Sequence, residues 1–166
     1  MATPVSSKPN RDAAEDSTEE RFKRAEDIKE HGNTLFRSGK YGEAKGRYLQ
    51  ALDAFVKVVA REDAPECCRA MLIACHLNVA ACALKAMDAE DAVLHSSAVL
   101  RMEPANVKAL YRRGHALFLK GDVASALTDL SAAAEASPGD KAVLALFREA
   151  EATSQEKAAA RRDAKK

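Results

Sequence analysis

Five polar side chains in this sequence have the types and the spacing to bind a carboxylate. They are two lysines, two asparagines and one arginine: Lys29, Lys108, Asn33, Asn78 and Arg112. Each lysine precedes another member of the set by four residues, which places the two on one face of a helix. Lysine and arginine supply positive charge, and asparagine amides supply directional hydrogen-bond donors. The five residues form one site only if the helices that carry them lie side by side.

A repeated pattern in the sequence indicates which helices would carry these residues. When Gly32 is aligned with Gly114, the residues 12, 16 and 19 positions later correspond as small, large and small apolar side chains. The aligned residues are Ala44, Tyr48 and Ala51 after the first glycine, and Ala126, Leu130 and Ala133 after the second. We expect the small residues at close helix contacts, because a helix pair of this size buries its apolar face only by stacking on neighbours.

A middle copy of the pattern fits between these two. Ala80 takes the glycine position, Ala92 is the next landmark, and Pro104 closes the copy 34 residues before Pro138. With this period the pattern resembles the tetratricopeptide repeat, a unit of two helices joined by a turn. The resemblance covers roughly residues 25–140. It implies an all-α fold in which three helix-turn-helix repeats stack into a right-handed superhelical solenoid, followed by a C-terminal capping helix.

The repeats form one expected domain from residue 17 to residue 140. They are expected near 25–58, 73–106 and 107–140, with 14 extra residues after the first. From Tyr41 to Arg61 the apolar residues keep a helical spacing, so we expect a second helix prolonged by about two turns, then a loop at 62–65. In this architecture the first helices of the repeats line the concave surface, and the five polar residues all fall on first helices.

The two ends of the sequence differ from the repeats. Residues 1–16 are rich in Ser, Pro, Ala and charge without a periodic apolar face, so we expect a disordered tail. Ser17 and Glu20 have the spacing of a capping box for the first helix. From Asp140 to Arg162 an apolar stripe predicts one more helix, so we expect 141–166 to form a capping helix and a basic tail.

Charge and composition narrow the classes of partner. The net charge is +1, from 26 basic and 25 acidic residues, so no overall field favours nucleic acid or a membrane surface. No run of about 18 apolar residues is apparent for a membrane span, and the N-terminus lacks the apolar core of a signal peptide. We therefore expect a protein of the cytoplasm or nucleus with no nucleic-acid or membrane partner. We also expect a monomer, because a capped solenoid of three repeats can be one.

Enzymatic and metal chemistry find little support in the sequence. The four cysteines lie within sixteen residues without a CxxC pair, so we expect reduced thiols and no metal site. The four histidines fall on different expected helices, and no Ser or Cys has a recognisable nucleophile motif around it. A glycine-rich phosphate loop is also absent from the sequence. We expect neither enzymatic activity nor a cofactor.

The five polar residues suit a ligand that has two carboxylates close together, because one carboxylate needs fewer donors. A peptide that ends in Asp has such a pair in its side chain and its terminal carboxyl. Phe36, one turn after Asn33, is placed to wall a small apolar pocket beside the charges. Arg113 and Lys45 are interpreted as solvated surface charges without a role in binding.

At the same five positions the sequence resembles the carboxylate clamp of tetratricopeptide co-chaperones. The clamp residues that this resemblance implies are Lys29, Asn33, Asn78, Lys108 and Arg112. In that family the clamp binds the C-terminal Glu-Glu-Val-Asp of heat-shock chaperones of the ninety- and seventy-kilodalton classes. The resemblance therefore implies a protein-interaction module whose partner is the C-terminal peptide of such a chaperone.

The segments 75–82 and 107–114 look especially like the large immunophilins, which usually carry a prolyl isomerase domain ahead of the repeats. Nothing of that kind fits in the short tail before Ser17, so we expect either a repeat-only relative or a fragment of a longer protein. Two alternatives to a co-chaperone module stay open at this point. One is the targeting fragment of a larger immunophilin-type prolyl isomerase, and the other is a repeat scaffold for an unrelated partner.

Overall fold

The structure is a computed structural model that describes residues 18–59 and 66–164. The expected N-terminal tail, the capping-box residue Ser17 and the expected loop at 62–65 lie outside these residues. Within the described ranges the chain forms seven helices and no strand. The helices are α1 (Thr18–Arg37), α2 (Tyr41–Val59), α3 (Glu66–Lys85), α4 (Ala89–Met102), α5 (Val107–Leu119), α6 (Val123–Ala136) and α7 (Lys141–Asp163).

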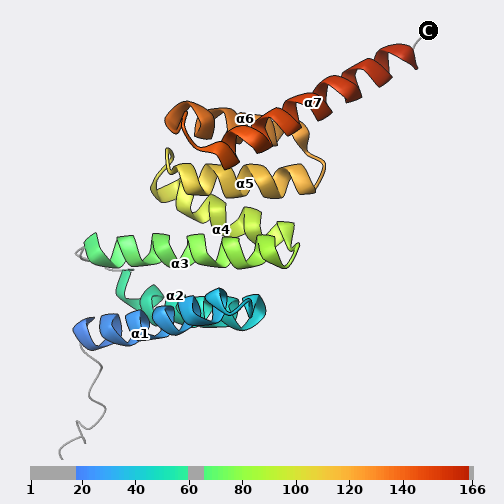
Figure 1. Cartoon of the computed structure of the whole chain (residues 1–166). Helices are drawn as coiled ribbons and strands as arrows, with labels where there is room; N and C mark the ends of the chain where they lie inside the picture. Colours follow the sequence, from blue (N-terminus) through green and yellow to red (C-terminus); the bar gives the residue numbers. More distant parts are fainter. Residues whose placement is uncertain (1–17, 60–65, 165–166) are drawn as a thin grey trace, which may run out of the picture.

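The helices pair as hairpins that stack along one direction (Figure 1). α1 packs on α2, α3 on α4 and α5 on α6, and α7 packs on α6. The first helices of successive hairpins also contact one another, α1 with α3, α3 with α5, and α5 with α7. One row of first helices therefore runs through the molecule, and it carries all five polar residues of the sequence hypothesis. The all-α solenoid expected from the sequence is confirmed.

The extra residues after the first repeat are divided between two helices. α2 has 19 residues where α4 and α6 have 14 each, which confirms a prolonged second helix. α3 has 20 residues where α5 has 13, because α3 begins at Glu66, well before Ile73. The interpretation that assigned the whole insertion to one helix and a loop is therefore wrong in part. Apolar spacing continues on both sides of the connection, so spacing alone does not show which helix has gained residues.

Close helix contacts explain the two glycines that define the repeat pattern. A Cβ atom on Gly32 would lie 2.7 Å from Cε1 of Tyr48, and a Cβ atom on Gly114 would lie 2.8 Å from Cγ of Leu130. The alanines of the pattern are fully buried: Ala44, Ala51, Ala80, Ala92, Ala126 and Ala133. The expected packing of small residues at close contacts, with large residues between them, is confirmed.

Replacing Gly114 with alanine is expected to lower the free energy of unfolding by about 1–2 kcal/mol, because overpacking outweighs the better helix propensity of alanine. The new Cβ would also lie 3.3 Å from the backbone oxygen of Ala126, which is held inside α6. Gly46→Ala is the matched control, since nothing lies within 4 Å of a Cβ there. This control should gain up to about 1 kcal/mol. Urea denaturation measures both changes, and a Gly114→Ala protein as stable as the wild type would contradict the packing.

α3 is the central helix, because it contacts α1, α2, α4 and α5. Cys75 and Val79 pack toward α1 and α2. Ile73 and Leu77 pack toward α4 and α5. Among the described residues, the window Cys68–Lys85 is consequently long and apolar enough to cross a membrane by length and composition, with half of it buried in the protein. The expectation that no such run exists is wrong, and the physical reason is that a helix covered on both sides needs no polar face.

α7 is helical and follows the third hairpin, as the apolar stripe predicted. Its N-cap residue, Asp140, accepts hydrogen bonds from two backbone N–H groups of the first turn, at 2.9 and 3.2 Å. Val143, Leu146 and Ala150 are buried against the helices of the stack. Residues 155–163 are exposed and project beyond the body of the molecule (Figure 1). The first half of α7 therefore covers the apolar end of the solenoid.

Two cations that the sequence interpretation treated as solvated are paired with acidic side chains. Arg113 on α5 donates to both carboxylate oxygens of Asp129 on α6, at 2.7 Å each, and Asp129 is only 4% exposed. Lys45 on α2 forms ion pairs with Asp88 and Asp91 at the start of α4. The interpretation of both cations as free surface charges is therefore wrong. Each one joins two helices, and the partners lie too far along the sequence for helical spacing to reveal them.

The middle hairpin holds two histidines in contact. Nδ1 of His76 on α3 lies 2.9 Å from Nδ1 of His95 on α4, so one ring donates a hydrogen bond and the other accepts it. Burial, followed by the neighbouring His95, lowers the pKa of His76 to about 4. Burial also lowers the pKa of His95. Both rings are therefore neutral at pH 7, and charging both of them at once would break the contact, because neither ring would keep an acceptor nitrogen.

Acid is expected to destabilise the fold through this histidine pair. An unfolded histidine titrates near pH 6.5 and His76 in the fold near pH 4, so between these values the unfolded chain binds more protons and stability falls as the pH falls. From about pH 7 to about pH 5 the loss should be on the order of 1–2 kcal/mol. Urea denaturation at several pH values should give a shallower slope for His76→Asn. His31→Asn, at an exposed position of α1, is the control, and equal slopes in all three proteins would contradict the assignment.

Candidate functional site

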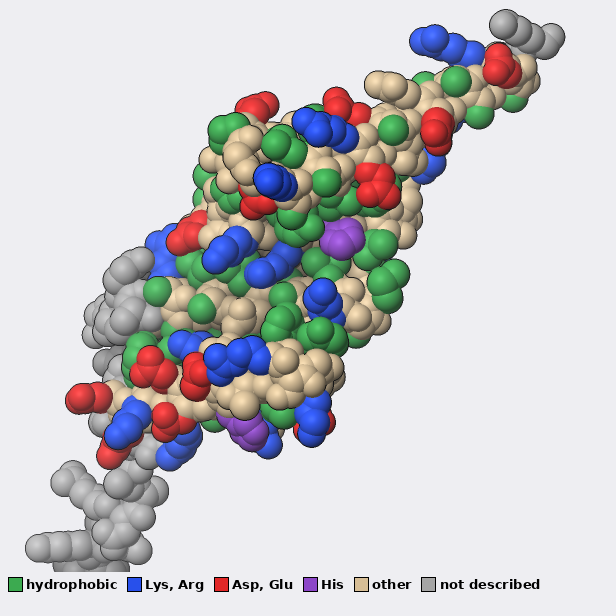
Figure 2. All heavy atoms as spheres, in the orientation of Figure 1, with side chains coloured by type: hydrophobic (Ala, Val, Ile, Leu, Met, Phe, Trp, Pro, Cys, Tyr) green, Lys and Arg blue, Asp and Glu red, His purple; other side chains and the backbone are tan. Residues whose placement is uncertain are grey.

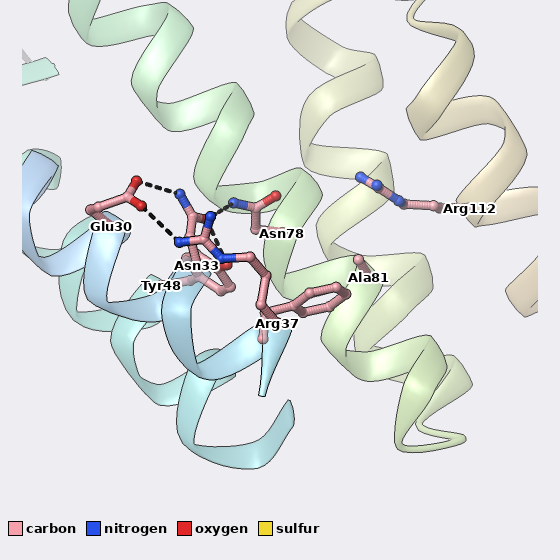
Figure 3. A pocket seen from close by; sticks show the side chains of 8 residues that line it. Glu30, Asn33, Arg37, Tyr48, Asn78, Ala81 and Arg112 are labelled. Carbon is pink, nitrogen blue, oxygen red and sulfur yellow. Dashed lines mark hydrogen bonds and ion pairs between the residues drawn. The ribbon is translucent and has the colours of Figure 1, made fainter. Parts of the chain in front are cut away.

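A cavity of about 350 Å³ lies between α1, α3 and α5 (Figure 3). The three first helices supply its wall together with one side chain from α2. The lining residues are Glu30, Asn33, Phe36, Arg37, Tyr48, Asn78, Ala81 and Arg112. Amide, guanidinium, hydroxyl and carboxylate groups therefore face one space, beside an aromatic ring and a methyl group.

Three of the five polar residues of the sequence hypothesis line this cavity. Asn33 comes from α1, Asn78 from α3 and Arg112 from α5, so the row of first helices brings together residues from all three hairpins. Phe36, which the sequence placed in the wall of an apolar pocket, lines the same cavity. The stacking of the hairpins thus places these four side chains around one volume.

The two lysines of the hypothesis are not among the lining residues. Lys29 is half-buried on α1 one turn before Asn33, and Lys108 is exposed in the first turn of α5. Each lysine therefore lies on the helix face of a lining residue, one turn away from it. In the part of the chain that the structure describes, neither lysine forms a hydrogen bond or an ion pair. Neither lysine lines the cavity, and each lies one helical turn before a residue that does.

Hydrogen bonds fix the amide of Asn33 in one orientation. Its Oδ1 accepts from the hydroxyl of Tyr48 at 2.8 Å and from Nδ2 of Asn78 at 3.3 Å. Its Nδ2 donates to Oε2 of Glu30 at 2.9 Å. A flipped amide would set its own oxygen against the carboxylate of Glu30, which has no proton to donate, so the observed orientation is the one that satisfies the network. One N–H of Asn33 and the carbonyl side of Asn78 are left for a ligand.

Tyr48 positions a polar group of the cavity as well as filling space between helices. The residue is 1% exposed, and burial raises the pKa of its hydroxyl to about 12. The hydroxyl therefore keeps its proton, and its bond to Asn33, throughout the neutral pH range. The sequence pattern identified Tyr48 only as a large packing residue, because a helical repeat pattern does not show where the end of a long side chain lies.

Arg112 points from α5 toward the two asparagines (Figure 3). One NH2 group donates to the backbone oxygen of Leu77 on α3 at 2.9 Å, which holds the guanidinium in place. Burial lowers the pKa of Arg112 from its ordinary value, but a guanidinium keeps its charge in proteins. Because a guanidinium has five N–H donors, the bond to Leu77 leaves others for an anion in the cavity.

Two charged residues that the sequence hypothesis omitted also line the cavity. Glu30 and Arg37 lie two turns apart on α1 and form an ion pair, with 3.2 Å between the guanidinium nitrogen and Oε1. The hydrogen bond from Asn33, and then the charge of Arg37, lowers the pKa of Glu30. A signal for them was present in the sequence: they stand three residues before and four residues after Asn33, on the same helix face.

Thiols lie in the core beside the cavity. Burial raises the pKa of Cys75 and of Cys82 to about 11 each, so both are neutral at pH 7. Together with Cys68 they belong to the cluster packed between α1, α2 and α3. Among the described residues, no three His, Cys, Asp or Glu side chains gather in a way that could hold a metal ion. The chemistry available in the cavity is hydrogen bonding and charge pairing.

The charge on the surface is unevenly distributed on the face drawn in Figure 2. Lys and Arg side chains predominate across the middle of the body, whereas toward its two ends Asp and Glu side chains lie among further Lys and Arg side chains (Figure 2). A near-zero net charge therefore coexists with a locally positive region. An anionic ligand would meet a locally favourable potential on such a face.

Comparison with known proteins identifies the repeat. Residues 83–141 match the family described as Tetratricopeptide repeat. The C-terminal TPR-containing domain of a Plasmodium falciparum protein described as FK506-binding superposes with a TM-score of 0.79 at 33% identity, over 83% of this chain and 93% of that chain. The chain belongs to the tetratricopeptide repeat family. Such TPR domains are protein-interaction scaffolds, and the identification made from the glycine and alanine landmarks is confirmed.

Two further similarities connect the TPR domain with immunophilins and chaperones. Peptidyl-prolyl cis-trans isomerase FKBP42 of Arabidopsis thaliana is 35% identical over 132 residues, which are 76% of this chain and 36% of that protein. The myosin chaperone UNC-45 from C. elegans, in complex with a Hsp90 peptide, has a TM-score of 0.71 at 28% identity, over 80% of this chain and 14% of that chain. The chain spans less than two fifths of the length of the curated relatives it matches. It is a TPR domain that resembles those of co-chaperones and immunophilins.

Proposed function

We propose that this TPR domain is a co-chaperone module that binds an acidic C-terminal peptide of the Glu-Glu-Val-Asp type. Such a peptide ends the heat-shock chaperones of the ninety- and seventy-kilodalton classes. The observation that carries the proposal is the meeting of Asn33, Asn78 and Arg112 in one cavity. Lys29 and Lys108 add two cations one turn away on the same helices. Three cations and two amides around one space suit the two carboxylates of a terminal Asp.

Each part of the cavity matches a part of such a peptide. Arg112 offers a planar pair of donors to the terminal carboxylate, and Asn78 offers an amide that can hold an extended peptide backbone. The lysines supply charge on long flexible stems, which can extend toward a ligand in the cavity. The ring of Phe36 packs on Tyr41, with 5.2 Å between ring centres. Phe36 and Ala81 together form an apolar wall that suits the valine before the terminal Asp.

Binding is expected to be micromolar, transient and weakened by salt. A charge-assisted hydrogen bond contributes about 1.5–3 kcal/mol, whereas ordering a flexible peptide tail costs about 2–5 kcal/mol. When the ordering cost is subtracted from the contribution of several such bonds, the binding free energy is about −8 kcal/mol, which corresponds to a Kd of about 1 μM. An affinity in this range suits a module that joins a chaperone and leaves it again.

The relatives support a chaperone partner. UNC-45, at 28% identity, is described in complex with a Hsp90 peptide, and FKBP42 belongs to the immunophilins that the sequence segments resemble. A shared fold does not by itself imply a shared ligand, so the proposal rests on the residues of the cavity, and these relatives provide additional support. We also propose that the protein is a monomer of the cytoplasm or nucleus.

Removing either flanking lysine is expected to weaken peptide binding. Lys29→Ala and Lys108→Ala should each raise the Kd for Met-Glu-Glu-Val-Asp at least about tenfold, or about 1.4 kcal/mol, because each removes a cation from the rim of the cavity. Helix content measured by circular dichroism should not change, since neither lysine forms a hydrogen bond or an ion pair within the described part of the fold. Lys141→Ala, exposed at the start of α7, is the matched control and should bind like the wild type. Wild-type affinity in both lysine variants would show that neither lysine takes part in peptide binding.

A further inference from the structure

The cavity already holds one carboxylate, which belongs to the protein itself. Oε2 of Glu30 accepts from Nδ2 of Asn33 at 2.9 Å, and Oε1 of Glu30 accepts from a guanidinium nitrogen of Arg37 at 3.2 Å (Figure 3). One amide and one guanidinium thus bind the two oxygens of a single carboxylate separately. Asn33 and Arg37 therefore have the right separation and direction to hold an acidic side chain.

The bond between Glu30 and Arg37 is easily exchanged for another. The side chain of Arg37 is 69% exposed and that of Glu30 is 62% exposed, so water surrounds most of the pair. Exposed ion pairs are weak because solvent screens them and both long side chains lose freedom. A carboxylate from a bound ligand can therefore take the place of Glu30 at little cost.

The pair lies on the side of the cavity opposite Arg112. In Figure 3, Glu30 and Arg112 lie at the two ends of the view, with Asn33 and Asn78 between them. A peptide whose terminal carboxylate meets Arg112 would extend past the two amides toward α1. The next acidic side chains along such a peptide would then approach the guanidinium of Arg37.

We infer that Arg37 is a further specificity-determining residue, which binds an acidic side chain upstream of the terminal residue of the peptide. Glu30 occupies this position in the ligand-free protein and is displaced when the peptide binds. The inference rests on the proposed function, because it assumes a peptide whose C-terminus enters the same cavity. The protein would then bind an acidic side chain of the ligand, through the guanidinium of Arg37, in addition to its terminal carboxylate.

A double-mutant cycle between the protein and its ligand tests this assignment. Calorimetric titrations would use the wild type and Arg37→Gln, each with Met-Glu-Glu-Val-Asp and with Met-Gln-Gln-Val-Asp. Arg37→Gln should weaken binding of the acidic peptide about fivefold and leave binding of the Gln peptide unchanged. Peptides with a single Glu→Gln change should locate the coupling at one of the two positions. Equal losses for both peptides would overturn the assignment.

Two further variants sharpen the test. Glu30→Gln should strengthen binding of the acidic peptide about threefold, because it removes the competing carboxylate and frees Arg37. Arg148→Gln removes one positive charge from an exposed position of α7 and should leave both affinities unchanged. A Glu30→Gln protein that binds the acidic peptide more weakly than the wild type would show that Glu30 supports the ligand, which contradicts its displacement.

Failure of this inference and failure of the proposed function give different results. Suppose that the wild type binds the acidic peptide and that amidation of the peptide's C-terminus abolishes this binding. If Arg37 then shows no coupling to either glutamate, only the role of Arg37 is overturned. If the wild type binds neither the free acid nor the amide, the proposed function itself fails, and the role of Arg37 fails with it.

Discussion

Replacing Arg112 with alanine is expected to weaken peptide binding roughly 10- to 100-fold, which corresponds to the loss of about 1.5–3 kcal/mol for a charge-assisted contact. Arg112 is the one cation among the predicted five residues that lines the cavity, and its guanidinium is already held in place by the backbone oxygen of Leu77. The ligand therefore meets a group whose position is fixed before binding, so little ordering cost is subtracted from the contact. Calorimetric titration with Met-Glu-Glu-Val-Asp measures the change.

Arg112→Lys separates charge from geometry in this prediction. Lysine keeps the positive charge but lacks the planar pair of donors, so its affinity should lie between those of the wild type and the alanine variant. Thermal unfolding of each variant shows whether loss of the bond to Leu77 disturbs the fold. A correctly folded Arg112→Ala protein that binds with wild-type affinity would place the ligand outside this cavity.

Replacing the neighbouring Arg113 with alanine is expected to have the opposite consequence: a loss of stability without a loss of binding. The free energy of unfolding should fall by about 2–4 kcal/mol, because Asp129 would be left buried without its partner. In the wild type, Arg113 donates to both oxygens of Asp129 at 2.7 Å, and the side chain of Asp129 is 6% exposed. Urea denaturation followed by circular dichroism measures the change.

A double variant provides the control for this prediction. Arg113→Met with Asp129→Leu replaces both charges by apolar groups of similar size and should recover most of the lost stability, since no buried charge remains unpaired. Peptide affinity of Arg113→Ala, measured below its unfolding temperature, should stay within about twofold of the wild type, since binding is assigned to the other face of α5. Equal stability of Arg113→Ala and the wild type would mean that the pair contributes little to the fold.

The fold could be predicted from the sequence because the same kind of helix packing recurs along the chain. Gly32 and Gly114 each sit where a Cβ would collide with a large side chain sixteen positions later. This requirement recurs at the same offset in the first and third hairpins, so the register can be predicted from the sequence alone. That register also placed Asn33, Asn78 and Arg112 on first helices, and the contacts between first helices bring them together.

Inter-helix contacts that occur only once in the molecule could not be predicted from the sequence in this way. Arg112 and Arg113 are neighbours in the sequence, yet one lines a cavity and the other pairs with a buried aspartate on α6. Helical spacing shows which residues share a face, but it does not show what lies opposite that face. For the same reason the pairing of Lys45 with Asp88 and Asp91 was missed.

Residue type alone did not identify every charged group of the cavity. Groups that attract a carboxylate were predicted from the sequence, whereas Glu30, a carboxylate of the same sign as the ligand, was not. Arg37 was omitted as well, although it stands on the same helix face as Asn33. In the structure these two charges contact Asn33 directly or through one another. A binding cavity can contain a group that resembles its ligand, and such a group is visible only when side-chain positions are known.

The most direct test of the carboxylate site is calorimetric titration of the chain with Met-Glu-Glu-Val-Asp, beside the same peptide with an amidated C-terminus. Amidation removes one negative charge and changes nothing else along the peptide. Binding of the free acid with a Kd of about 1 μM, weakened at least about tenfold by amidation, is the expected result. Equal binding of the two peptides, or binding of neither, would contradict the assignment of this cavity to a peptide carboxylate.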